Sequence, residues 1–166
     1  MPFRALALLV LLLAGAPPAA AADHLAFFGF ELINTSPEPT RPDETARLAT
    51  IGDIARTELG KHGYELVDIA PVADEVAKRR PLRDCNGCEL DPARQLGAGL
   101  AAFGWVQKVS NLILNINLQI RDVATGRLVQ AASTDIRGNT EESWEHGIRY
   151  LIKNRLFASG STGGNG

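Results

Sequence analysis

The sequence predicts a single α/β (α+β) domain built on one mixed β-sheet of about five strands. Three observations support this prediction. A continuous apolar run at residues 25–33 is followed by a helical pattern and a second short strand, which together make a βαβ unit. Residues 112–121 alternate between apolar and polar side chains and lead into a glycine-containing turn, which indicates an antiparallel hairpin. A final apolar stripe has the spacing of a C-terminal helix packed on the sheet.

The two ends of the chain are expected to lie outside this domain. Arg4, an apolar run at residues 5–14 and small residues ending in three alanines have the layout of a secretory signal peptide over residues 1–22. The apolar run is shorter than the roughly 20 residues that span a bilayer, so we expect cleavage near Ala22 and no stable membrane insertion. We therefore expect a periplasmic protein with one domain at 23–157, followed by a disordered, glycine-rich tail at 158–166.

The charge of the exported part argues against a nucleic-acid partner. Without Arg4, 16 basic residues accompany 19 acidic ones, which gives a net charge of −3. These charges are dispersed, and no basic stripe is present that would follow a phosphate backbone.

The first half of the domain is predicted as strand, loop, helix and strand. The apolar run at 25–33 suggests a strand that is covered on both faces, and the prolines of 34–42 indicate an exposed loop. Residues 43–62 form a helix and 64–69 a short strand. The helix is recognised by apolar residues three and four positions apart, namely Leu48, Ile51, Ala55 and Leu59.

The second half is predicted as two short helices, three strands and the final helix. The short helices occupy residues 71–80 and 92–96, and strands follow at 100–109, 112–121 and 128–137. Asn139 is expected to cap the final helix, with Glu142 as its capping-box partner. The apolar face of this helix consists of Trp144, Ile148, Leu151, Ile152 and Leu156.

The only two cysteines, Cys85 and Cys88, have a C-x-x-C spacing that admits three interpretations: a redox dithiol, half of a metal site or a structural disulfide. An exported protein meets an oxidising compartment, and the intervening Asn86-Gly87 pair is a strong turn former. The favoured interpretation is therefore a disulfide that holds a tight turn and presents Glu89 and Asp91 at the surface.

The alternative is a periplasmic thiol–disulfide oxidoreductase that uses the same two cysteines. Reactive thiolates of that class lie at a helix N-terminus. Here Asp84 precedes Cys85 with a charge that raises a thiol pKa, and the predicted helix begins only after both thiols.

No catalytic residues, metal ligands or cofactors are predicted. The three histidines, His24, His62 and His146, fall in different elements and lack the spacing of a zinc site. No G-x-S-x-G motif or phosphate-binding glycine loop occurs.

A polar cluster at Asn111, Asn115 and Asn117 lies on or beside the alternating strand. It is either a solvated sheet face or a hydrogen-bonding surface for a partner or ligand. Trp105, with Phe103, is either part of the core or the wall of a pocket in a small-ligand carrier, for instance for a quinone or a metal.

Three segments resemble a known type of exported domain. The run RQLGAG, LAAFGWVQKV and NLILNINLQIRDVATGRLVQ at residues 94–109 and 111–130 resembles the amino-terminal domain of TolB and the related curli-secretion-type α/β domains. In that pattern, Asp122, Thr125 and Gly126 occupy the hairpin turn. The resemblance implies an α/β fold that serves in protein–protein interaction.

Across the whole exported chain, FGFELINTS, RDCNGCELD and VQKVSNLILNINLQIRDVATG together resemble a small family of exported proteobacterial proteins of unknown function. This resemblance implies a link to quinoprotein (pyrroloquinoline quinone) alcohol-oxidation or envelope systems. We therefore expect a non-catalytic periplasmic accessory protein with a protein partner, the alternatives being the oxidoreductase and the small-ligand carrier.

Overall fold

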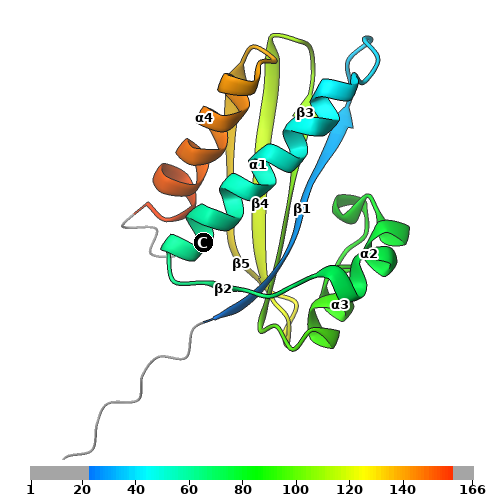
Figure 1. The fold of residues 1–166 in the computed structure, drawn as a ribbon, viewed down its shortest axis with the longest axis vertical. Coiled ribbons are helices and arrows are strands. Elements are labelled where there is room, and N and C mark those ends of the chain that lie inside the picture. Colours follow the sequence, from blue (N-terminus) through cyan, green and yellow to red (C-terminus); the bar gives the residue numbers. More distant parts are fainter. Residues whose placement is uncertain (1–22, 159–166) are drawn as a thin grey trace, which may run out of the picture.

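The computed structural model describes residues 23–158, and the predicted signal peptide and nearly all of the predicted tail lie outside these described residues. Within this range the chain forms one five-stranded mixed sheet in the order β2-β1-β3-β4-β5, with helices on both faces (Figure 1). The predicted fold class, including the βαβ unit, the hairpin and the C-terminal helix on the sheet, is confirmed.

The βαβ unit consists of β1 (His24–Asn34), α1 (Pro42–Lys61) and β2 (Glu65–Leu66), and β1 runs parallel to both β2 and β3. The predicted strand at 64–69 is reduced to two residues. Its continuation is prevented at Asp68, whose carboxylate accepts a hydrogen bond from the Ala70 backbone N–H (2.9 Å) and so turns the chain. Beyond Leu25, β1 therefore has no strand partner on the β2 side among residues 23–158.

Four short helical segments cover the part of the sheet around β1 and β3 on the face away from α1. They are η1 (Ala70–Val72), α2 (Ala73–Arg79), η2 (Leu82–Asp84) and α3 (Leu90–Gln95). The small core beneath them includes Phe28, Phe103, Val76 and Leu82. The helices predicted at 71–80 and 92–96 are thus present, with ends shifted by one or two residues.

The remaining strands, β3 (Leu100–Lys108), β4 (Ile113–Asp122) and β5 (Leu128–Arg137), form an antiparallel meander. One alternating set of β4 side chains enters the main core, as the period of two predicts: Leu114, Ile116, Leu118 and Ile120. Gly126 closes the hairpin with a φ of +71°, and the carboxylate of Asp122 accepts from the Thr125 N–H.

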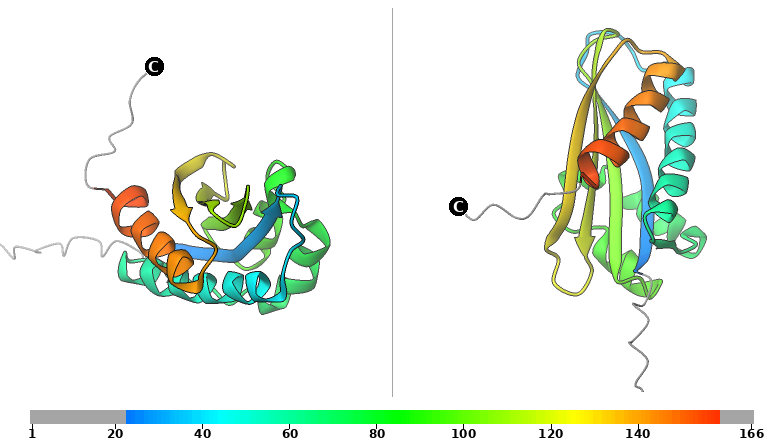
Figure 2. Two further views of the ribbon diagram at one scale, coloured as in Figure 1. Left: turned by 90° about the horizontal axis from the view of Figure 1, so that it is seen from above. Right: turned by 90° about the vertical axis from the view of Figure 1, so that its left-hand side faces the viewer.

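Helix α4 (Glu141–Leu151) continues as the π-helical turn η3 (Ile152–Leu156) and lies beside α1 on the same face of the sheet (Figure 2). All five apolar residues predicted for its inner face are buried. The predicted cap at Asn139 is wrong by one residue. The N-cap is Thr140, whose hydroxyl accepts from the Ser143 N–H at 3.2 Å.

Asn139 instead belongs to a buried polar cluster that joins α1, β3 and α4. The ammonium of Lys108 donates to the carboxylate of Glu44 at 2.6 Å, and both side chains are fully buried. The amide of Asn139 donates to the same carboxylate and accepts from the indole N–H of Trp144. The second carboxylate oxygen of Glu44 accepts from the backbone N–H of Arg41, which closes a capping box at the start of α1.

Candidate interaction surface

The sheet face opposite α1 and α4 is left largely open over β3, β4 and β5. The side chains here alternate with those of the main core, and each is half-buried or exposed. We call this face the Trp105 surface. It consists of Trp105, Gln107, Asn115, Asn117, Gln119, Arg121, Ala131, Ser133 and Asp135.

Hydrogen bonds order the polar part of the Trp105 surface across two strands. Asn117 lies opposite Trp105 in the β3–β4 register and donates to Asn115 at 2.6 Å. Asn115 in turn donates to the carboxylate of Asp135 on β5 at 2.8 Å. Because each amide is held by its neighbour, this row is presented in a fixed orientation beside the indole ring.

Two small hollows adjoin Trp105. One, of about 260 Å³, lies over Asn117, Gln119 and the middle of β5. The other, of about 180 Å³, lies between Trp105, Arg121 and the segment 82–86. Ligand pockets for drug-sized molecules have volumes of about 300–1,000 Å³, so each hollow suits a protein side chain better than a quinone.

The disulfide forms one border of the Trp105 surface. Cys85 and Cys88 are bonded to each other, and Gly87 between them has a φ of +95°, which favours glycine. The turn directs Asn86 at Arg121, whose guanidinium donates to it at 3.3 Å. The pair therefore acts as a staple that holds the turn against β4.

The surroundings of Cys85 disfavour a reactive thiolate. Its sulfur lies 3.6 Å and 3.7 Å from the carbonyl oxygens of Arg79 and Leu82. A thiolate at this position would face the partial negative charges of two carbonyl oxygens, which disfavour the thiolate. In addition, α3 begins at Leu90, after both cysteines, so neither sulfur lies at its N-terminus.

The position of Glu89 differs from the prediction for this turn. It was predicted to be presented at the surface, but only 1% of it is exposed, beneath Arg121 at 3.5 Å from the guanidinium Nε. Burial raises the pKa of Glu89, and the positive charge of Arg121 only partly opposes this effect. Asp91, the other residue expected at the surface, is exposed.

The four residues predicted for binding are divided between two places. Trp105, Asn115 and Asn117 lie together on the Trp105 surface. Asn111 lies apart, where its side-chain oxygen accepts from Asn139 at 3.2 Å in the buried polar cluster. Sequence reasoning missed Gln119, although it follows Asn115 and Asn117 in the same alternation.

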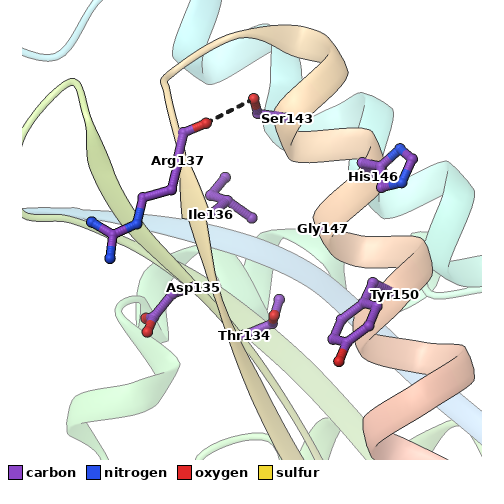
Figure 3. A pocket seen from close by; sticks show the side chains of 8 residues that line it. All are labelled: Thr134, Asp135, Ile136, Arg137, Ser143, His146, Gly147 and Tyr150. Carbon is purple, nitrogen blue, oxygen red and sulfur yellow. Dashed lines mark hydrogen bonds between the residues drawn. The ribbon is translucent and has the colours of Figure 1, made fainter.

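A further hollow, of about 290 Å³, lies between β5 and α4 (Figure 3). Ser143 and His146 line it, but the Ser143 hydroxyl donates to the carbonyl of Arg137 at 3.0 Å. Within residues 23–158, no hydrogen bond joins Ser143 to His146. The same residues contain no cluster of three or more potential metal ligands, and no helix among them has the length and apolarity to span a bilayer.

Solved structures with a related fold include two C-terminal domains of LpoB. The domain from Salmonella enterica has a TM-score of 0.52 at 14% identity, and the match covers 74% of this chain and 87% of that one. The domain from Escherichia coli has a TM-score of 0.50 at 16% identity, with coverages of 74% and 88%. Lipoprotein GNA1162 from Neisseria meningitidis matches with a TM-score of 0.47 at 17% identity, over 70% of this chain and 82% of that one.

At these identities the likeness to LpoB concerns the fold alone. The resemblance to TolB and curli-secretion domains is not shown by these comparisons and stays a prediction. Among curated proteins, none matches the chain. One family model, DUF3280, described as "Protein of unknown function (DUF2380)", matches residues 23–156, nearly the whole described domain. The chain therefore belongs to the DUF3280 family.

Proposed function

We propose that this protein is a non-catalytic periplasmic accessory protein that binds a protein partner through the Trp105 surface. The observation that carries the proposal is the combination of an indole ring with a fixed row of amides on an otherwise uncovered sheet face. Aromatic residues that lie beside small hollows are typical anchors of protein interfaces. The hydrogen-bonded row of Asn117, Asn115 and Asp135 offers polar groups that need no reordering on binding.

The proposed location rests on the signal-peptide pattern of residues 1–22 and on the disulfide. A bonded C-x-x-C pair persists in an oxidising compartment such as the periplasm. The proposed partner belongs to a quinoprotein alcohol-oxidation system or another envelope system. That link comes from the sequence resemblance alone.

The proposal is tested by affinity capture from periplasmic extract with three forms of the tagged, exported chain. The forms are the unchanged protein, Trp105→Ala and His62→Ala. His62 is a suitable control because its aromatic ring is exposed at the C-terminal end of α1, on the opposite face of the sheet from the Trp105 surface.

We expect the unchanged chain and His62→Ala to recover the same partner, and Trp105→Ala to recover at least about tenfold less, as for a typical interface anchor. Equal recovery by all three forms would contradict the Trp105 surface as the binding site. Turnover of a substrate by the purified protein would contradict the non-catalytic role.

A further inference from the structure

A second region, distinct from the Trp105 surface, is an open strand edge on β1. On one side β1 pairs with β3 as far as Asn34. On the other side β2 pairs only with His24 and Leu25. From Phe27 onward, no strand of the described residues lies against this side of β1, which forms an edge of the sheet in Figure 1.

The carbonyls of Phe27 and Phe28 accept from Arg56 and Arg80, but beyond them the backbone of β1 directs hydrogen-bonding groups at this edge that have no partner within residues 23–158. The Thr35 N–H donates to the Lys108 carbonyl of β3 at 2.9 Å. Because backbone groups of a strand point alternately to either side, residues 31 and 33 also face β3, and Phe30 and Leu32 face the open edge. A bulge at Gly29, which has a φ of +78°, determines which residues face the open edge, because it shifts the register with β3 between Phe27 and Phe30.

A groove with a volume of about 480 Å³ follows the same edge. Its floor is the β1 segment from Phe30 to Ile33. One wall is Leu48 of α1, and the other wall is Arg80 with Pro81, on the opposite face of the sheet. The groove therefore follows the strand, with Leu48 bordering it on one face of the sheet and residues 80–81 on the other, which is where an added strand would lie.

One buried carboxylate oxygen in the groove lacks a partner. Glu31 lines the groove and is only 7% exposed. Its Oε1 accepts from Arg80 at 2.7 Å and from the Leu82 N–H at 2.9 Å. Its Oε2 is buried without a hydrogen bond within residues 23–158. A buried acceptor without a partner reduces the free energy of unfolding, and a donor from a bound ligand would remove that penalty.

We propose that this edge binds an extended segment of a partner protein as an added strand next to β1. The segment carries apolar side chains at alternate positions, which pack against Phe30 and Leu48. On its other face it carries a lysine or arginine, which donates to Glu31. Backbone bonds to Phe30 and Leu32 supply the affinity, and the side-chain pattern supplies the specificity.

Charge complementarity disfavours a second copy of the chain that pairs through its own β1. The β1 sequence HLAFFGFELIN contains no lysine or arginine. Pairing β1 with β1 of another molecule would therefore leave the free oxygen of Glu31 without a basic partner from that strand.

The test is selection from a phage-displayed library of random peptides of strand length on the purified, exported chain. The selected peptides are then measured against Leu32→Pro, Glu31→Gln and Trp105→Ala. Proline at position 32 removes an N–H that faces the open edge and none that faces β3, so the ladder with β3 is kept. Glu31→Gln keeps the strand and removes the charge, and it serves as the second variant if Leu32→Pro fails to fold.

We expect enriched peptides with alternating apolar residues and one lysine or arginine. Their affinity should fall by at least about tenfold in Leu32→Pro and by about tenfold in Glu31→Gln, and it should be unchanged in Trp105→Ala. Amide exchange at Phe30 and Leu32 should slow when the peptide binds.

Three results overturn the proposal: no enriched motif, equal affinity for the unchanged chain and both edge variants, or a dimer of the free chain that Leu32→Pro or Glu31→Gln dissociates. The last result would assign the edge to a second copy. None of the three bears on the Trp105 surface, so this inference and the proposed function fail separately.

Discussion

The buried pair of Lys108 and Glu44 provides the sharpest test of how this fold is held together. Lys108→Met keeps an unbranched side chain that is only one atom shorter, and it removes the charge. The carboxylate of Glu44 is then left in a site with no exposure to water. It keeps its hydrogen bonds from the Asn139 amide and the Arg41 backbone, but it has no countercharge.

The expected cost follows from this geometry. Removing one partner of a buried ion pair typically costs about 3–5 kcal/mol, because the other charge remains uncompensated. The two remaining hydrogen bonds to Glu44 place the expected value near the lower end, at about 3 kcal/mol. The double variant Lys108→Met, Glu44→Gln has no buried charge, so we expect it to be more stable than Lys108→Met alone by about 1–2 kcal/mol.

The pH dependence gives a second, independent signature. Burial by itself would raise the pKa of Glu44, but the hydrogen bonds from Lys108, Arg41 and Asn139 hold it below its ordinary value of 4.5. In the unchanged protein this stabilisation is complete at neutral pH and is lost as the pH falls through the lowered pKa. In Lys108→Met the pKa of Glu44 should instead rise above 4.5, because burial is no longer opposed by the lysine. Acidification then protonates Glu44, so this variant should be destabilised less at low pH than at pH 7.

The assay is urea unfolding of the three forms at several values between pH 4 and pH 7, followed by the fluorescence of Trp144, with Trp105→Phe as the common background. Trp144 is fully buried and donates to Asn139, so its emission reports on this cluster. A loss below about 1 kcal/mol for Lys108→Met at pH 7, or a double variant less stable than the single one, would refute the reasoning.

Three further predictions concern packing, titration and the disulfide. Gly104→Ala should destabilise the protein by at least about 2 kcal/mol in thermal or urea unfolding, because the new Cβ would lie 2.2 Å from the Phe30 ring; an unchanged melting temperature would contradict this packing. Glu89→Gln should stabilise the protein at pH 7, because the raised pKa of Glu89 means that its charged form is unfavourable in the folded state. Below pH 4 the glutamate is protonated and the substitution should have no such effect; urea unfolding at both pH values measures the difference. Replacing Cys85 and Cys88 by serine should cost no more than about 2 kcal/mol, since the closed loop is very short. The unchanged protein should not reduce insulin, and measurable activity would favour the oxidoreductase.

The sequence predicted the strands best where hydrophobic alternation alone determines the structure. The return strand at 128–137 has the predicted ends, and the alternating strand is shifted by only one residue. The strand at 64–69 was predicted too long, because its apolar residues resemble a strand while the local turn at Asp68 ends it. Local hydrogen bonds of this kind leave little trace in hydrophobic periodicity.

The polar clusters could not be predicted because their members are distant in sequence. Glu44 is separated from Lys108 by 64 residues and from Asn139 by 95. Nothing in the local pattern shows that the lysine near the end of a strand is fully buried. The burial of Glu89 likewise depends on Arg121 of another element. Alternation along one strand places Asn115 and Asn117 on the same face, but the register between β3 and β4, which brings Trp105 opposite Asn117, cannot be predicted from that alternation.

The most direct test of the central claim is photo-crosslinking in living cells, with a photoreactive amino acid placed on the Trp105 surface. Ser133 is a suitable position because it is exposed at the middle of that surface, and Glu142 on α4 is the control because it is exposed on another element. We predict one defined adduct with a periplasmic protein from position 133, lost in Trp105→Ala, and none from position 142. Absence of the adduct at 133, or the same adduct from both positions, would contradict binding through the Trp105 surface.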